Sequence, residues 1–189
     1  GLKIETMLKL KTNPGFDLVV TVECGITAVD EVEFVRKILK TDIIVTDHHE
    51  PGDKLPACVC VNPKLGYPFR DLSGSGVALK VVQALSDEET AKYFCDLASI
   101  GTIADIMPLE SENRAIVKLG CAHVRNKGLA SLLRANKIAA ESVDCSSMAM
   151  KICPKINAAG RVDAPTAALD LLLADNAADA EMKVAALMD

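Results

Sequence analysis

A short apolar run that ends in one carboxylate and two imidazoles constrains the fold of this chain more than any other feature. Residues 42–46 read Asp-Ile-Ile-Val-Thr, and Asp47, His48 and His49 follow directly, with Pro51 close behind. β-Branched residues bounded by turn formers predict a buried strand. The polar side chains then lie at its carboxyl end, where open parallel sheets bind ligands. Aspartate and histidine together are also a suitable ligand set for a divalent metal.

A second strand with the same layout lies upstream. Phe16 to Val22 is an apolar run that ends in Glu23, and residues 27–40 between the two runs carry apolar side chains near the helical period. A strand, helix and strand in this order form a right-handed crossover with parallel strands, so Glu23 and Asp47 are expected at the same edge of the sheet. The tripeptide alone would fit a solvated turn, but two carboxylates at neighbouring strand ends favour a site.

The rest of the chain predicts one more short strand, over residues 58–61, and then helices. Ser73-Gly74-Ser75-Gly76 opens a helix that reaches about residue 85, and the chain from about residue 87 to 189 is mainly helical. The helices predicted there cover residues 90–106, 113–125, 129–135, 164–174 and 177–188. The predicted fold class is therefore α/β, a parallel sheet flanked by helices with a mostly helical C-terminal half.

Composition limits the class of protein further. The chain has 189 residues, 50% of them hydrophobic, which is enough for a well-buried core. No apolar run approaches the ~20 residues that a membrane-spanning helix needs, and no signal peptide is evident, so we expect a cytoplasmic protein with no membrane partner. The net charge is −5, aromatic residues make up 3% and Trp is absent. Such a surface is poor in the cations and stacking rings that hold nucleic acids.

Four stretches together resemble a known family. They are Asp-Leu-Val-Val-Thr-Val-Glu-Cys-Gly at 17–25, Val-Thr-Asp-His-His-Glu-Pro-Gly at 45–52, Gly-Thr-Ile-Ala-Asp-Ile-Met-Pro-Leu at 101–109 and Ile-Asn-Ala-Ala-Gly-Arg at 156–161. They look like successive motifs of the DHH phosphoesterase superfamily and most resemble its RecJ-like branch of single-strand-specific DNA exonucleases. The resemblance implies that residues 1–189 form a single DHH-type α/β catalytic domain. It also implies a missing first strand, because the Asp-x-Asp metal motif of the family does not occur here.

The resemblance further implies a two-metal site for Mn²⁺ or Mg²⁺. It places Glu23, His48 and Asp105 as metal ligands, with Glu23 at the bridging position where the family has aspartate. Glutamate keeps the charge but extends it by one methylene, so the bridging geometry is expected to change. Asp47 is expected to orient a ligand or join the metal shell. His49 is expected to face the scissile phosphate, because two adjacent histidines do not readily aim at one metal.

Substrate contacts are assigned to two further clusters. Asn157, Gly160 and Arg161 lie in the most basic stretch of the chain, and an arginine fork matches phosphate oxygens. Ser75 and Gly76 begin a helix whose free N–H groups would suit a phosphate. Ordinary capping explains the same two residues, and the sequence leaves this alternative open.

The function implied is metal-dependent hydrolysis of phosphodiesters by a 5′ to 3′ exonuclease on single-stranded DNA, in repair or recombination. Most of the contact with DNA would then come from parts beyond this acidic stretch, and other replication or repair proteins are candidate partners. One alternative is a phosphoesterase of small nucleotides or oligonucleotides. Another is a catalytically inactive scaffold of the RecJ type, which the unusual Glu23 favours and the retained Asp47, His48, His49 and Asp105 disfavour.

Overall fold

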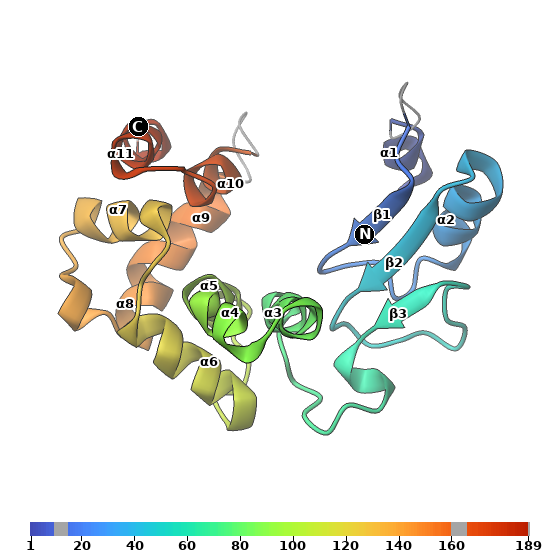
Figure 1. The fold of residues 1–189 in the computed structure, drawn as a ribbon, viewed down its shortest axis with the longest axis horizontal. Coiled ribbons are helices and arrows are strands. Elements are labelled where there is room, and N and C mark those ends of the chain that lie inside the picture. Colours follow the sequence, from blue (N-terminus) through green and yellow to red (C-terminus); the bar gives the residue numbers. More distant parts are fainter. Residues whose placement is uncertain (10–14, 160–165, 189) are drawn as a thin grey trace. The chain divides into compact units, whose positions relative to one another are not determined.

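The computed structural model describes residues 1–9, 15–159 and 166–188. The chain forms two compact units, Gly1–Ala78 and Leu79–Asp189 (Figure 1). The first contains a sheet, and the described part of the second is helical. The predicted α/β class with a mostly helical C-terminal half is confirmed. A single domain over the whole chain stays a prediction. No helix in the described ranges is long and apolar enough to cross a membrane.

Within the described residues, the sheet of the first unit has three parallel strands in the order β1-β2-β3. They are β1 (Leu18–Thr21), β2 (Asp42–Thr46) and β3 (Val59–Val61). Thr21 pairs with Val45 in register, and Thr46 pairs with Val61. The carboxyl ends of all three strands therefore meet at one edge, as the crossover rule predicts for parallel strands.

Helices cover one face of this sheet. α1 (Ile4–Leu8) and α2 (Val29–Phe34) lie on it, and α2 continues as a π-helical turn over Val35–Leu39 (Figure 1). Val32 and Val35 are fully buried and pack with the inward-facing residues of β2. The predicted helix at 27–40 is thus present as a shorter α-helix and a wider turn. Lys40 ends it in the left-handed conformation, with φ 58°.

From β3 the chain passes through a 3₁₀ turn, Pro63–Leu65, to α3 (Gly74–Leu85). The second unit begins within α3 and continues with α4 (Glu88–Tyr93) and α5 (Cys95–Ala104). The one helix predicted at 90–106 is therefore divided. Phe94 interrupts it, with ψ 8°, between the end of α4 and the start of α5.

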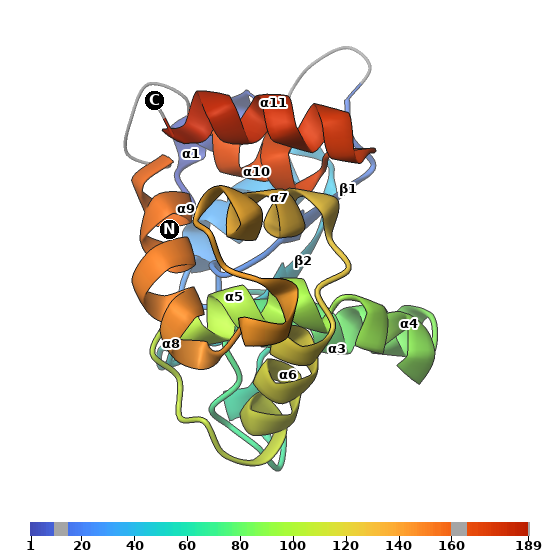
Figure 2. The same ribbon diagram turned by 90° about the vertical axis from the view of Figure 1, so that its left-hand side faces the viewer.

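The core of the second unit is formed by helices from its whole length. They are α6 (Ser111–Ala122), α7 (Lys127–Ala135), α10 (Ala167–Leu172) and α11 (Ala177–Met188). α11 lies beside α7 and α10 (Figure 2). Leu129, Leu132 and Leu171 are completely buried between them. These helices match the predicted ones to within a few residues.

One helical stretch was not predicted from the sequence. It comprises a 3₁₀ turn (Ala140–Ser142), α8 (Cys145–Ser147), a π-helical segment (Met148–Ile152) and α9 (Cys153–Ala159). Pro154 near its middle is a helix-breaking signal, because proline lacks an N–H and crowds the preceding turn. The wider π turn lies just before it. Burial of Met148 and Ile152 in the core stabilises a helix that local propensity does not favour.

Candidate metal centre

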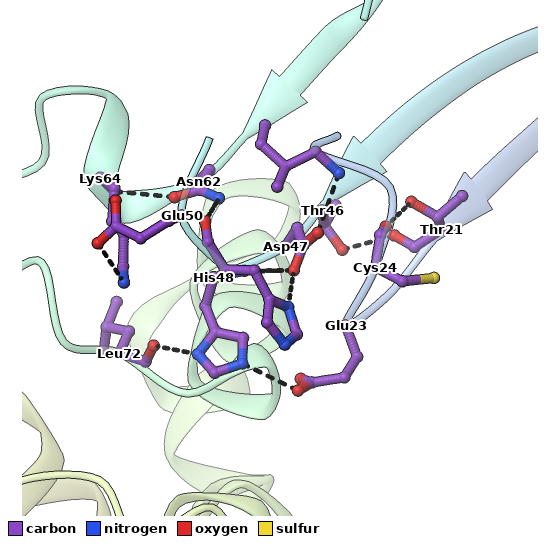
Figure 3. A network of polar contacts seen from close by, with 12 residues as sticks. Thr21, Glu23, Cys24, Thr46, Asp47, His48, Glu50, Asn62, Lys64 and Leu72 are labelled. Atoms are coloured by element: carbon purple, nitrogen blue, oxygen red, sulfur yellow. Dashed lines mark hydrogen bonds and ion pairs between the residues drawn. The ribbon is translucent and has the colours of Figure 1, made fainter. Parts of the chain in front are cut away.

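The ends of β1 and β2 bring Glu23, His48 and His49 together. One ligand atom from each lies within 4.8 Å of the other two. Figure 3 shows Glu23 reaching from the loop after β1 toward the imidazole of His48, which follows β2. The predicted meeting of the two strand ends is therefore observed, and it gathers one carboxylate and two imidazoles.

Hydroxyl groups fix the loop that carries Glu23. The Thr46 hydroxyl donates to the carbonyl oxygen of Thr21 at 2.7 Å, and the Thr21 hydroxyl donates to that of Cys24 at 2.7 Å. Gly25 then turns the chain with φ 116°. A Cβ at Gly25 would lie 3.1 Å from the Thr21 hydroxyl and 3.2 Å from both Val45 methyl groups. The turn therefore needs glycine for both conformation and space.

Asp47 is the buried centre of the polar network and is 1% exposed. Its Oδ2 accepts the Ile26 N–H at 3.0 Å, and its Oδ1 accepts the N–H groups of His48 at 2.8 Å and His49 at 3.2 Å. Burial would raise the pKa of Asp47, but the hydrogen bonds from Ile26, from the His49 ring and from the two histidine N–H groups together hold it below its usual value. Asp47 is thus an ionised acceptor.

The ionised carboxylate sets the tautomer of His49. Its Nδ1 lies 2.7 Å from Asp47 Oδ1 and must carry the proton, since the carboxylate only accepts. When the half-exposed ring is neutral, Nε2 then carries the lone pair. A carboxylate behind an imidazole is the usual way to orient a metal-binding or proton-accepting histidine.

His48 is nearly buried, and both of its ring nitrogens face oxygen acceptors. Nδ1 lies 3.2 Å from the carbonyl oxygen of Leu72, and Nε2 lies 2.9 Å from Glu23 Oε1 (Figure 3). A neutral imidazole has one N–H and cannot donate to both. With the proton on Nε2 the ring donates to Glu23. With the proton on Nδ1 it donates to Leu72, and Nε2 and Glu23 Oε1 are then two acceptors that a shared cation would join.

Glu23 itself adopts an unusual backbone conformation, with φ 65°. Left-handed backbone is uncommon for residues other than glycine and costs of order 1–3 kcal/mol, so the surrounding contacts must hold it. One such contact is Gly74 at the start of α3. A Cβ there would overlap the Glu23 carboxylate and lie 2.6 Å from its Cδ.

Three positioning residues were missed by the sequence analysis. Asn62 is buried, donates from Nδ2 to the His49 carbonyl at 2.9 Å and accepts the Lys64 N–H at 2.9 Å. Leu72 contributes only a carbonyl oxygen, and Gly74 contributes only space. An Asn-Pro step after a strand could have indicated Asn62, but no local signal points to the other two.

The start of α3 supports the capping interpretation of Ser75 and Gly76. The Ser73 hydroxyl accepts the Gly76 N–H at 3.0 Å and lies 3.0 Å from the Ser75 hydroxyl. The Gly76 donor is therefore already engaged within the helix start, as in ordinary capping. Phosphate binding by these two residues stays a prediction.

The remaining predicted site residues belong to the second unit. Asp105 is the exposed C-cap of α5, and Ile106 next to it has φ 55°, a strained conformation for a β-branched residue. Asn157 is exposed on α9. Gly160 and Arg161 lie outside the described residues. The roles of all four stay predictions, as does the orientation of His49 toward a phosphate.

The donor set fits a divalent metal of intermediate hardness. Carboxylate oxygen with imidazole nitrogen suits Mn²⁺, and oxygen-rich sites also take Mg²⁺, whereas thiolates select softer metals. His49 offers Nε2 while Asp47 holds Nδ1, and His48 offers Nε2 when its proton lies on Nδ1. The ligand atoms of Glu23, His48 and His49 lie within 4.8 Å of one another, so these residues fit the metal that the resemblance implies.

Comparison with known proteins gives consistent matches. Residues 2–104 match the DHH family, N-terminal domain. The chain is 40% identical over 174 residues to the single-stranded-DNA-specific exonuclease RecJ of Bacillus subtilis, covering 88% of this chain and 22% of that protein. The match therefore spans about a fifth of the length of that relative.

Two solved structures are similar over nearly the whole chain. RecJ from Thermus thermophilus in complex with Mn²⁺ superposes with a TM-score of 0.84 at 35% identity, covering 98% of this chain and 29% of that one. An exonuclease RecJ bound to manganese gives 0.82 at 32% identity, covering 100% and 49%. Both share the fold, and both hold the metal that the present donor set fits.

Proposed function

The chain belongs to the DHH family, and from that premise we propose that this protein is a metal-dependent exonuclease that hydrolyses single-stranded DNA in the 5′ to 3′ direction. The observation that carries the proposal is the cluster of Glu23, His48 and His49, whose ligand atoms lie within 4.8 Å of one another and whose chemistry suits a divalent cation. Similarity to RecJ exonucleases supports the substrate, and the manganese in their structures supports Mn²⁺ or Mg²⁺ as cofactor.

In this mechanism Glu23 and His48 would hold the metal, and Asp105 is proposed as a further carboxylate ligand on the resemblance alone. A bound metal pair would neutralise charge on the phosphoryl oxygens and supply a nucleophilic water at neutral pH. With metal bound at Nε2, the proton of His48 would lie on Nδ1, where the Leu72 carbonyl oxygen accepts it. Strain beside Asp105, at Ile106, supports a functional role there, because strained backbone clusters at active sites.

His49 and Asp47 act together in this proposal. Asp47 holds the proton of His49 at Nδ1, so the exposed Nε2 can accept a proton and then donate a hydrogen bond to a phosphoryl oxygen. Ser75, Gly76, Asn157, Gly160 and Arg161 are proposed contacts to the phosphates of the strand. A place in repair or recombination, a cytoplasmic location and contacts with other replication proteins remain predictions.

Two alternatives differ in substrate or in activity. A phosphoesterase of small nucleotides would use the same metal ligands on a dinucleotide. An inactive scaffold would have no physical need for the buried hydrogen-bonded network around Asp47 and His48, which disfavours it.

The test is Mn²⁺ binding by calorimetry together with hydrolysis of a labelled single strand and of a dinucleotide. We expect Mn²⁺ binding that His48→Ala abolishes, with hydrolysis of the strand. His123→Ala is the matched control, because His123 is exposed at the end of α6. Preference for the dinucleotide would replace the proposal with the first alternative. Metal binding without hydrolysis of either substrate would support the scaffold.

A further inference from the structure

The second unit contains a pocket of about 240 Å³ between the junction of α4 and α5 and the start of α7. Tyr93 and Phe94 line it from the junction, and Arg125 and Lys127 line it from the segment that begins α7. None of these residues belongs to the motifs of the metal centre. The pocket combines exposed rings and cations in a chain that is otherwise acidic and poor in aromatic residues.

The two rings lie at the junction where α4 ends and α5 begins. α4 stops at Tyr93, and Phe94 leaves helical geometry before α5 begins. Tyr93 is 50% exposed and Phe94 is 38% exposed. Their centroids are 5.3 Å apart with the planes at 76°, so the pair packs edge to face. An exposed ring face can stack on a nucleobase of any sequence.

Two cations stand beside these rings. The Arg125 guanidinium lies 5.3 Å from the Tyr93 ring centroid, in a cation–π arrangement that holds it at the pocket. The Lys127 ammonium donates to the backbone carbonyl oxygen of Asp175, which occupies one of its three donors. Both side chains are thus positioned at the pocket, and both can still donate to a phosphate.

The acidic groups of the pocket do not cancel these cations. Asp96 is 2% exposed, and its Oδ2 accepts the N–H groups of Arg125 and Asn126, each at 2.7 Å. Its Oδ1 accepts the Leu97 N–H at 2.8 Å, so the buried charge is balanced by backbone donors. Asp175 is the one exposed carboxylate among the lining residues, against two exposed cations.

We propose that this pocket binds one nucleotide of a single-stranded DNA, with the base against Tyr93 and Phe94 and a phosphate held by Arg125 and Lys127. The proposal rests on the proposed function for the substrate class, and it places a DNA contact within the described part of the chain. A single stacked base with adjacent cations is the recurring unit of sequence-independent single-strand binding. It would compensate in part for the net charge of −5.

The chain offers a direct optical test. It has no Trp and two tyrosines, Tyr67 and Tyr93. In a Tyr67→Phe variant, Tyr93 is therefore the sole source of tyrosine emission. We expect a short oligothymidylate, added with a metal chelator that prevents hydrolysis, to quench this emission saturably. Thymidine monophosphate should quench it only at much higher concentration.

Substitutions in the same background separate stacking from charge. Phe94→Ala should weaken binding roughly tenfold, which is within the range for loss of one stacked base. Arg125→Gln and Lys127→Gln should each reduce the slope of log Kd against log salt by about 0.7, the contribution of one phosphate contact on a single strand. Arg114→Gln and Lys118→Gln, two exposed positions of α6, make the same charge changes outside the pocket lining and should leave the Tyr93 signal and Kd unchanged.

Several results would overturn the proposal. Binding of the oligothymidylate without quenching of Tyr93 would place the DNA contact elsewhere while the exonuclease function stands. Equal affinity for the mononucleotide would make the pocket a free-nucleotide site. Equal effects of the pocket and control substitutions on Kd would show that binding depends on the overall charge of the protein and not on this pocket. Hydrolysis with Mn²⁺, measured separately, tests the proposed function independently of this pocket.

Discussion

The carboxylate of Glu23 occupies the space that a side chain on Gly74 would need. An ideal Cβ at residue 74 would overlap Oε2 of Glu23 and lie 2.6 Å from its Cδ, while Oε1 of the same carboxylate faces His48 Nε2 at 2.9 Å. The longer arm of glutamate thus has room because α3 begins with glycine at this position. The aspartate that the resemblance implies at this position would need less room, so Gly74 explains how this chain accommodates a glutamate.

Gly74→Ala should therefore damage the metal centre. The new methyl group displaces the Glu23 carboxylate from His48, and we expect Mn²⁺ affinity to fall roughly 10–100-fold, as for other groups that position a ligand. Alanine favours helices over glycine, so loss of α3 is not the expected cause. Calorimetric titration with Mn²⁺, with the circular dichroism spectrum as a check on folding, measures the effect.

The matched control and the rescue make this prediction specific. Gly52→Ala places a methyl group no closer than 3.9 Å to any neighbour in the same unit and should leave Mn²⁺ affinity unchanged. Adding Glu23→Asp to Gly74→Ala shortens the arm by one methylene and should restore part of the affinity. A double variant as weak as Gly74→Ala alone would show that the two residues are not coupled.

Asp47→Asn should remove an acid-dependent part of the stability. Hydrogen bonds hold the pKa of Asp47 below its ordinary value of 3.8. A lowered folded-state pKa stabilises the protein fully above the unfolded-state value, and this contribution is lost as pH falls through the folded-state value. Wild type should therefore lose more unfolding free energy than Asp47→Asn as pH falls below about 4.

Thermal unfolding in chelator, at a series of pH values, checks this. The comparison is made below pH about 5, where histidines are already protonated in the unfolded chain of both proteins. Asp42→Asn is the control, since Asp42 is exposed at the start of the same strand. Parallel stability curves for wild type and Asp47→Asn would contradict the assignment of Asp47 as an ionised, hydrogen-bonded acceptor.

Asn62 should hold the loop that carries His49. Asn62→Asp keeps the oxygen that accepts the Lys64 N–H but loses the donor to the His49 carbonyl at 2.9 Å. Two oxygens then face each other at a buried position, and we expect a loss of about 1–3 kcal/mol in the free energy of unfolding. Denaturant titration measures it. Asn62→Ala is measured for comparison. An unchanged free energy of unfolding in Asn62→Asp would show that Asn62 contributes only to the turn and not to holding the His49 loop.

The part of the site that was predictable from the sequence is the part that local pattern and strand order determine. β-Branched residues before Asp47 indicate β2, and the crossover rule brings Glu23 to the same sheet edge. The roles of Leu72 and Gly74 could not be predicted, because one contributes a backbone carbonyl and the other an absent side chain, and both act only after α3 has packed.

Helix α9 was missed for a related reason, since Pro154 argues locally against a helix that burial of Met148 and Ile152 stabilises.

Asp96 offers a test of the second unit that is independent of metal. Its buried carboxylate accepts the N–H groups of Leu97, Arg125 and Asn126 and so joins the start of α5 to the segment before α7. In Asp96→Asn, an NH2 group replaces one of the two accepting oxygens and faces a backbone N–H. The other oxygen still accepts, but it no longer carries a negative charge. We expect a loss of about 1.5–3 kcal/mol in the free energy of unfolding, the range for hydrogen bonds to charged groups.

Asp170→Asn, at an exposed position of α10, is the control and should change the free energy of unfolding little. Because the same carboxylate positions Arg125, Asp96→Asn should also weaken quenching of Tyr93 by oligothymidylate. Unchanged stability with unchanged quenching would show that the three N–H groups do not depend on Asp96.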